Sequence, residues 1–268
     1  MIVRSQERLG WVLQEAGPEH ADHTVLLLPG ALATSAFYED LLAEPSIHEA
    51  RIRFIATTLP GFGGTAPPDD LSMESYSKLA SRLAAELSCD VVVGHSLGAN
   101  VAIEMASAGQ FSGPLVLLSP SFSRQDESMV PRALDRLSRL FGHLPYSLVL
   151  RLAGPAFKSS LPPARREFLT NELKKNDPRF LRAQVRSYLA YLDGHGSLAR
   201  RFCDAGVPAW VVYGERDDVG ITSDERELLA AAPQVTLVEI ADAGHFTLNE
   251  KPDEIAAIVL QAVTNAAG

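Results

Sequence analysis

The sequence predicts an α/β fold in which a mostly parallel sheet is flanked by helices and a helical segment is inserted late in the chain. Three observations support this. Short apolar runs alternate with helical patterns, and one of these runs leads through a Gly-x-Ser-x-Gly turn into a helical pattern. The alternation stops between residues 123 and 205. A length of 268 residues fits one large domain that carries an insertion.

Short apolar runs bounded by turn residues are expected to form the parallel strands. They cover residues 24–28, 53–57, 90–93, 115–118, 209–213 and 236–240. Residues 9–15, which precede them, are expected to form an antiparallel edge strand. Apolar residues at helical spacing predict helices over residues 35–42, 73–87, 97–108, 223–231 and 252–264.

Residues 123–205 contain no clear strand pattern. Amphipathic helical patterns appear instead at residues 132–141, 165–174 and 179–192, with prolines near the expected helix starts. A structureless loop of this length is not credible inside a compact domain. We therefore expect an α/β core made of residues 1–122 and 206–268, with residues 123–205 forming a helical lid, or cap.

The charge of the chain is divided unevenly between these parts. The formal net charge is −9, which argues against nucleic acid as the main partner. Residues 123–205 hold 15 Lys and Arg against 8 Asp and Glu, whereas the rest holds 9 basic and 25 acidic residues. The basic lid either simply complements an acidic core or steers an anionic substrate into the cleft below it.

Other bulk features favour an intracellular protein. The chain has no run of 18 apolar residues, and its first ten residues lack the apolar segment of a secretory signal. We therefore expect no membrane partner and a cytoplasmic location. Cys89 and Cys203 are expected to be reduced thiols, with a disulfide or a reactive thiol as the alternatives.

The segment Gly94-His95-Ser96-Leu97-Gly98 is the strongest chemical motif. A serine on a strained strand-to-helix turn holds its hydroxyl in open space at the end of a sheet. The flanking glycines are expected because a side chain there would collide as strand and helix approach each other. Serine needs a base to become a nucleophile, and that base needs an orienting acid.

Candidates for both partners follow later strands. Asp217 comes after the strand at residues 209–213, although its neighbours Glu215 and Asp218 are competitors that spacing does not separate. His245 follows the last expected strand and is the candidate base. His95 should point away from Ser96 on the tight turn, so we interpret it as a packing or hydrogen-bonding residue.

An oxyanion hole requires two backbone N–H groups aimed at the developing negative charge. One should come from Leu97, the residue after the nucleophile. The other should come from the loop that follows the strand at residues 24–28, where Ala31 is the expected donor.

These motifs together resemble the α/β-hydrolase fold superfamily, in its lid-bearing group of serine esterases, enol-lactonases and haloperoxidase-like enzymes. Four stretches match in order, and in this resemblance the acid position falls on Asp217. Two departures are Pro29, where the family usually has His, and Thr58, where it usually has Asp. The matching stretches are residues 29–31, 59–65 and 94–98, and the acid and histidine loops at 214–217, 244–246 and 250–252.

The resemblance implies a serine hydrolase that cleaves a carboxylic ester or lactone through Ser96, Asp217 and His245, with no cofactor and no metal. The dehalogenase and epoxide-hydrolase branches carry Asp in place of this serine, which excludes them. The carbon–carbon hydrolases rank lower because their oxyanion loop is longer than residues 29–34. Alternatives are a small-molecule receptor with slow turnover and a triad enzyme with perhydrolase or lyase chemistry.

Overall fold

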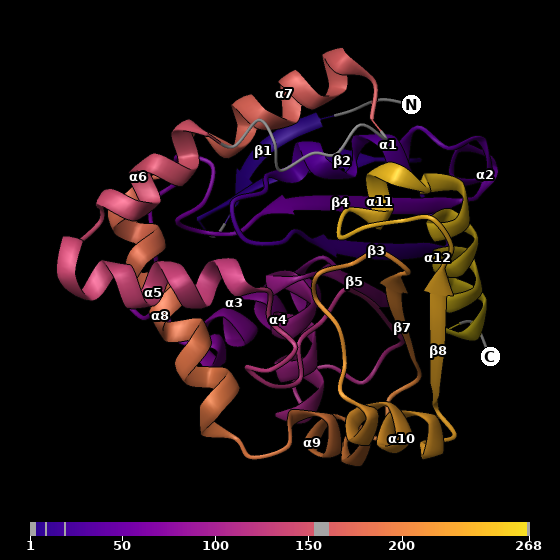
Figure 1. Cartoon of the computed structure of the whole chain (residues 1–268). Helices are drawn as coiled ribbons and strands as arrows, with labels where there is room; N and C mark the ends of the chain where they lie inside the picture. The colour runs from indigo at the N-terminus through magenta and orange to yellow at the C-terminus, as the bar shows by residue number, and fades with distance from the viewer. Residues whose placement is uncertain (1–3, 9, 19, 153–160, 267–268) are drawn as a thin grey trace.

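The computed structural model describes residues 4–8, 10–18, 20–152 and 161–266, and it arranges them around an eight-stranded sheet (Figure 1). The strand order is β1-β2-β4-β3-β5-β6-β7-β8. The pairs β1–β2 and β2–β4 are antiparallel and all other neighbours are parallel, which confirms the expected fold class. The strands are β1 (Arg4–Arg8), β2 (Trp11–Ala16), β3 (His23–Leu28), β4 (Ile52–Thr58), β5 (Val91–His95), β6 (Leu115–Leu118), β7 (Ala209–Gly214) and β8 (Val235–Ile240).

Helices cover both faces of the sheet because the side chains of the central strands alternate between two apolar clusters. Leu26 and Leu28 belong to a cluster with residues of α3, α4, α9 and α10. Val25 and Leu27 belong to the other, with residues of η1, α1, α2, α11 and α12. These helices are η1 (Ser35–Tyr38), α1 (Glu39–Leu42), α2 (Pro45–Glu49), α3 (Met73–Glu86), α4 (Leu97–Ser107), α9 (Leu198–Asp204), α10 (Ser223–Ala231), α11 (Thr247–Glu250) and α12 (Pro252–Ala266).

The register of the parallel strands brings their carboxyl ends to one edge of the sheet. Leu28 is paired with Gly94, and Gly94 with Leu117, so β3, β5 and β6 end at the same level. Leu118 is paired with Val212, which brings the end of β7 to this level as well. The loops that follow these strands therefore converge at the carboxyl edge of the sheet, where open α/β sheets build their sites.

The remaining helices come from the segment between β6 and β7. They are α5 (Met129–Phe141), α6 (Leu144–Arg151), α7 (Pro163–Leu173) and α8 (Pro178–Gly194). Helices α5, α6 and α8 pack against one another, while α7 contacts η1 and α8 contacts α3. Helix α9, the last element of the range 123–205, packs against α4 and α10. We propose that this range acts as a cap, with α5–α8 lying beside the carboxyl edge in Figure 1.

Several sequence expectations about individual elements were wrong. The strand expected at residues 9–15 is not an edge strand, because β2 pairs with β1 on one side and β4 on the other. The true edge, β1, contains no apolar residue and so has no hydrophobic pattern to reveal it. The helix expected at residues 35–42 is divided into η1 and α1. Helices α2, α6, α9 and α11 were not expected.

Among the described residues, none of the helices combines the length and the apolar character needed to cross a membrane.

Candidate active site

Ser96 occupies the turn between β5 and α4 in a strained backbone conformation. Its φ of 49° and ψ of −116° lie outside the regions that non-glycine residues favour. Its amide donates a hydrogen bond of 2.8 Å to the carbonyl of Leu118 on the neighbouring strand β6. A Cβ added at Gly94 would lie 2.4 Å from the carbonyl oxygen of Gly98, and one added at Gly98 would lie 2.2 Å from that of Leu28. Both glycines are therefore required for the turn, as the sequence suggested.

Asp217 and His245 form a hydrogen-bonded pair at the carboxyl edge. The distance from His245 Nδ1 to Asp217 Oδ1 is 3.0 Å. The aspartate side chain is 1% exposed, while the imidazole is 26% exposed, so solvent reaches the imidazole and not the carboxylate. Ser119 Oγ donates to Asp217 Oδ2 at 2.5 Å, and the Val219 amide donates to Oδ1 at 2.9 Å. This carboxylate is fixed from three directions.

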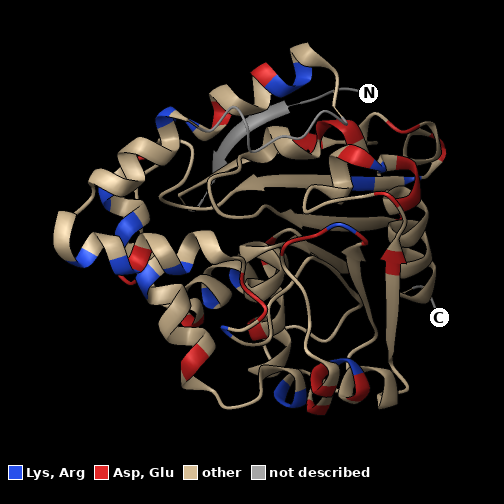
Figure 2. Cartoon of the chain, in the orientation of Figure 1, with Lys and Arg blue, Asp and Glu red and all other residues tan. Residues whose placement is uncertain are grey.

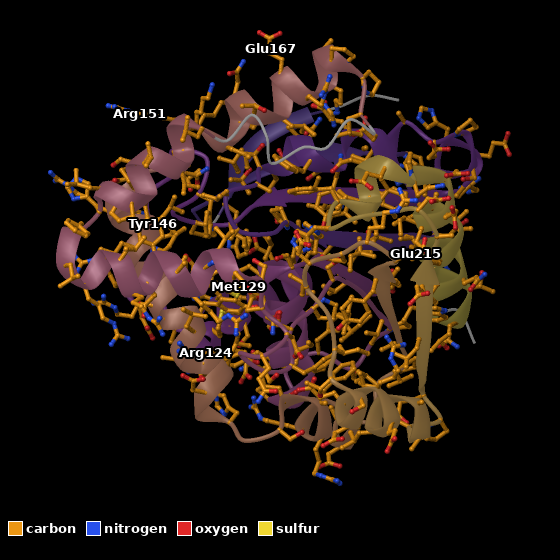
Figure 3. The ribbon with its side chains drawn as sticks, viewed as in Figure 1. Arg124, Met129, Tyr146, Arg151, Glu167 and Glu215 are labelled. Carbon is orange, nitrogen blue, oxygen red and sulfur yellow. The ribbon has the colours of Figure 1, made fainter. Side chains whose placement is uncertain are left out.

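The two competing carboxylates make different contacts. Glu215 is exposed and accepts a hydrogen bond from the Asp242 amide at 2.8 Å. Its side chain lies beyond the end of β7 in Figure 3, and that of Asp218 is exposed as well. In the described part of the chain, neither carboxylate forms a hydrogen bond with His245. Of the three candidates that spacing alone could not separate, Asp217 is the one that contacts the histidine.

The environment favours the ionised form of Asp217 and the protonated form of His245. Burial alone raises the pKa of the Asp217 carboxyl, but hydrogen bonds and the nearby imidazole outweigh it and lower the net value. Burial lowers the pKa of the His245 imidazole, but the hydrogen bond and the charge of Asp217 outweigh this and raise it above its ordinary value. Since a carboxylate only accepts hydrogen bonds, Nδ1 of His245 carries the proton that it donates, and Nε2 is left as the basic nitrogen.

His95 contacts the loop that carries His245. Its Nε2 donates to the backbone carbonyl of His245 at 2.9 Å, and the two ring centroids are 4.9 Å apart. Burial, together with the charge of His245, lowers the pKa of His95 to about 3, so its ring stays neutral. This agrees with a packing and hydrogen-bonding role for His95, which fixes the position of the His245 backbone.

The expected oxyanion donors lie on the two segments that border Ser96. Leu97 is the first residue of α4, and the first backbone bond of this helix runs from the Asn100 amide to the Ser96 carbonyl. The N–H of Leu97 therefore has no acceptor within the helix and lies at the positive end of its dipole. A Cβ added at Gly30 would lie 3.1 Å from Ser96 Cβ, so the loop that holds Ala31 packs directly on the elbow.

Asn176, between α7 and α8, connects the cap to this loop. Its Nδ2 donates to the carbonyl of Leu32 at 2.8 Å, and its Oδ1 accepts from the Gly63 amide at 3.0 Å. Leu32 has a strained φ of 71° and follows Ala31 directly. Nearby, Glu172 accepts a hydrogen bond of 2.8 Å from the hydroxyl of Thr34. The cap thus holds the loop of Leu32 and Thr34 and the glycine-rich loop of Gly63 in one arrangement.

Sequence reasoning missed Ser119 and Asn176. Ser119 follows β6 at the carboxyl edge of the sheet, as Ser96 and Asp217 follow β5 and β7. That position could have marked Ser119 as a candidate site residue. Asn176 lies in a segment without strand ends or known motifs, and nothing in the sequence marks it.

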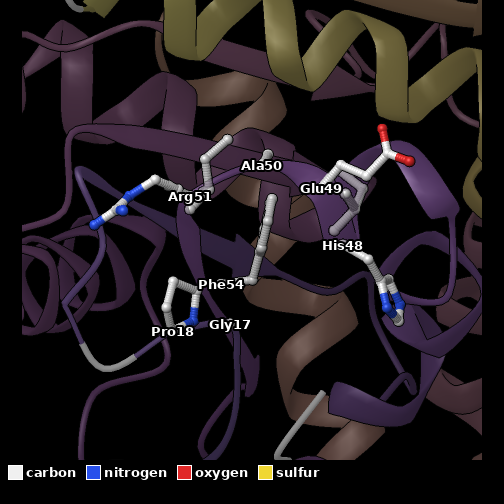
Figure 4. A pocket seen from close by; sticks show the side chains of 9 residues that line it. Gly17, Pro18, His48, Glu49, Ala50, Arg51 and Phe54 are labelled. Atoms are coloured by element: carbon white, nitrogen blue, oxygen red, sulfur yellow. The ribbon is translucent and has the colours of Figure 1, made fainter.

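A pocket of about 410 Å³ lies elsewhere on the molecule (Figure 4). It is lined by residues of α2, by Gly17 and by Ile52 at the start of β4. This places it at the amino ends of the strands, on the side opposite to Ser96. Its histidine, His48, is bonded through Nε2 to the Leu42 carbonyl at 2.9 Å. We assign the pocket no part in the site.

Within the part of the chain that the structure describes, no group of three or more His, Cys, Asp or Glu side chains is arranged to hold a metal ion.

Comparisons with known proteins agree with this architecture. A sequence model of the alpha/beta hydrolase family matches residues 25–258. No curated protein matches the chain. Among solved structures, the N-acyl homoserine lactonase AidH is 20% identical, with a TM-score of 0.74 and coverage of 99% of this chain and 97% of its own. The esterase EaEST from Exiguobacterium antarcticum is 14% identical, with a TM-score of 0.75 and 95% of both chains covered.

MenH from S. aureus is a further structural neighbour, at 18% identity and a TM-score of 0.76, with 96% of this chain and 99% of MenH covered. At such low identities these likenesses establish the shared fold alone. The family match extends over most of the chain, including Ser96, Asp217 and His245. The chain belongs to the alpha/beta hydrolase family.

Proposed function

We propose that this protein is a serine hydrolase that cleaves a carboxylic ester or a lactone. The observation that carries the proposal is the hydrogen bond between Asp217 and His245 at the same sheet edge as the strained turn of Ser96. An esterase and a lactonase among the structural neighbours support this substrate class.

In the proposed mechanism, Ser96 Oγ attacks the carbonyl carbon while Nε2 of His245 takes its proton. Asp217 keeps the proton on Nδ1 and stabilises the imidazolium that forms. The backbone N–H groups of Ala31 and Leu97 hold the oxyanion of the tetrahedral intermediate. His245 then returns the proton to the leaving alcohol, which leaves an acyl group on Ser96. Water, deprotonated by His245, releases the acid.

The test combines turnover with covalent labelling. The purified protein is assayed on a panel of esters, lactones and thioesters, and separately treated with a fluorophosphonate that reacts with activated serines. We expect many turnovers on at least one ester or lactone, and a single adduct on the peptide that contains Ser96. Labelling of Ser96 with no more than one product per protein molecule would favour the slow receptor. No labelling at Ser96 would overturn the proposal.

The pH dependence of kcat/KM should reflect the environment of His245. The base must be unprotonated, and Asp217 raises its pKa above the ordinary value. Activity should therefore fall with decreasing pH along a limb whose apparent pKa lies above about 6.5. The measurement is kcat/KM on a short-chain chromogenic ester between pH 5 and 9, at pH values where circular dichroism shows the protein folded. A flat profile down to pH 5 would contradict His245 as the base.

Asn176→Ala should lower kcat about tenfold with little change in KM. The substitution removes the partners of the Leu32 carbonyl and the Gly63 amide, so the loop that holds Ala31 loses its cap contact. An oxyanion donor acts mainly in the transition state, and its displacement should therefore appear in kcat. The readouts are steady-state kinetics and the melting temperature.

Asp177→Ala is the matched control for this prediction. Asp177 is the adjacent residue, and its side chain caps α8 by accepting from the Arg179 amide at 2.8 Å. Its loss should lower stability by about 1 kcal/mol and leave kcat of the folded protein unchanged. Equal kcat values for the two variants would show that Asn176 only stabilises the cap.

A further inference from the structure

The outer surface of the cap carries an unusual concentration of exposed apolar side chains. Leu140 is 80% exposed and Met129 is 74% exposed. Of the nine large apolar side chains that are exposed among the described residues, all but Phe168 lie between residues 129 and 152. We call these eight the apolar cap face: Met129, Val130, Leu137, Leu140, Phe141, Leu144, Leu148 and Leu152.

Helix α5 presents this face outward because its polar side is the one that is buried. Asp135 and Ser138 lie on the buried side. Asp135 accepts from Arg186 of α8 at 3.3 Å and from Arg139 of α5 at 3.0 Å. These polar contacts fix the rotation of α5 on the cap. At about 100° per residue, the five large apolar residues of α5 that are exposed fall within an arc of about 120°.

Arginines border this arc. Arg132, Arg136 and Arg139 lie on the adjoining side of α5, and the first two line a shallow groove of about 400 Å³ together with Met129 and Leu137. Figure 2 shows the Lys and Arg residues of α5 in blue on the outer cap helices, and Figure 3 shows Met129 at one end of α5. The whole range 123–205 carries seven more basic than acidic residues.

We propose that the apolar cap face docks on an anionic phospholipid surface. A helix with one broad apolar face and a bordering row of arginines is the pattern that lies in the plane of a membrane interface. The apolar side chains would enter the boundary between headgroups and acyl chains, and Arg132 and Arg136 would contact lipid phosphates.

A second copy of this chain fits the surface less well. In an antiparallel pairing of two α5 helices, the arginine rows of both copies would lie on the same side of the interface, where their like charges would repel each other. An anionic lipid surface instead complements them. The expectation of no membrane partner rested on the absence of a spanning segment, and an interfacial helix needs none.

The experiment measures co-sedimentation of the full chain with vesicles. One vesicle type is pure phosphatidylcholine, and the other contains phosphatidylglycerol as well. We expect binding to the anionic vesicles, which weakens as salt is raised, and little binding to the neutral ones. The double variant Leu140→Gln/Phe141→Gln should bind at least about tenfold more weakly. Arg132→Gln/Arg136→Gln should lose about fivefold for each arginine at low salt.

Two single variants serve as controls, Gln261→Leu and Gln261→Glu. Gln261 is an exposed residue of α12, which lies on the opposite side of the molecule from the cap in Figure 1. They alter surface polarity or charge and should leave vesicle binding unchanged. Because Leu140 and Phe141 are exposed, their replacement should not lower the melting temperature, and this measurement shows that each variant is folded.

Absence of binding to anionic vesicles, or binding that the apolar double variant retains, would overturn the proposal. So would a concentration-dependent dimer, seen by light scattering without vesicle binding and broken by the same variant. That result would assign the face to a second copy of the chain.

Discussion

Ser96→Ala is expected to lower kcat by about 10⁵-fold, with the fold intact. The hydroxyl is the only protein group in the proposed mechanism that bonds to the acyl carbon, so alanine removes the acyl-enzyme route entirely. The residual rate would come from the oxyanion donors and from substrate binding. Because the Ser96 amide, and not its hydroxyl, bonds to the Leu118 carbonyl, the turn keeps its backbone anchor.

Ser88→Ala is the matched control for this substitution. Ser88 is also a serine with positive φ, at 52°, but it follows α3 and is exposed. The same chemical change there should leave kcat unchanged and alter the melting temperature as little as Ser96→Ala does. The measurement is steady-state hydrolysis of the best ester or lactone found in the panel. A Ser96→Ala protein with activity within tenfold of the unmodified chain would remove the serine from the mechanism.

The arrangement of the central sheet was predictable because buried parallel strands leave a strong apolar pattern. Each of the six expected parallel strands overlaps an observed one, from β3 to β8. The candidate site was located by the same logic, since residues that come directly after these strands must meet at one edge. Strand β1 was not predictable, because its backbone pairing with β2 leaves no mark in the hydrophobic pattern.

Spacing narrowed the candidate acid to three residues, and only the resemblance to the family selected Asp217 among them. Glu215, Asp217 and Asp218 lie within four residues, and the apolar pattern places all of them after β7. The backbone turn after β7 determines which carboxylate points toward His245. The Asp217 amide donates to the Gly214 carbonyl at 3.0 Å, and the Val219 amide donates to the Asp217 carboxylate. These short-range bonds aim one carboxylate inward and leave its neighbours exposed.

The contacts of Ser119 and Asn176 could not be predicted from the sequence for a related reason, although the position of Ser119 directly after β6 was a usable signal. Ser119 contacts an aspartate 98 residues later in the chain, and Asn176 contacts a carbonyl 144 residues earlier. Neither contact produces a short-range spacing pattern in the sequence. Both depend on how loops and cap pack once the sheet has brought their ends together, and hydrophobic periodicity does not encode that packing.

Asp217→Asn is expected to lower kcat by about 10⁴-fold, which is the size of the effect when the orienting carboxylate of such a triad becomes an amide. The asparagine amide can donate to Nδ1 of His245, which would move the ring proton to Nε2 and remove the basic nitrogen from the serine. The acid limb of the pH profile should also move to lower pH, because the charge that raises the pKa of His245 is lost.

Three companion variants test this assignment. Ser119→Ala keeps the carboxylate but removes its 2.5 Å hydrogen bond, so it should cost about tenfold in kcat, far less than Asp217→Asn. Asp218→Asn and Glu215→Gln make the same kind of change on exposed neighbours and should leave kcat within about twofold, as expected for surface groups outside the mechanism. The measurement is kcat and the acid-limb pKa of all four proteins on one substrate. If Asp218→Asn or Glu215→Gln were the most damaging, the orienting acid would be that residue, and the Asp217–His245 bond would be structural only.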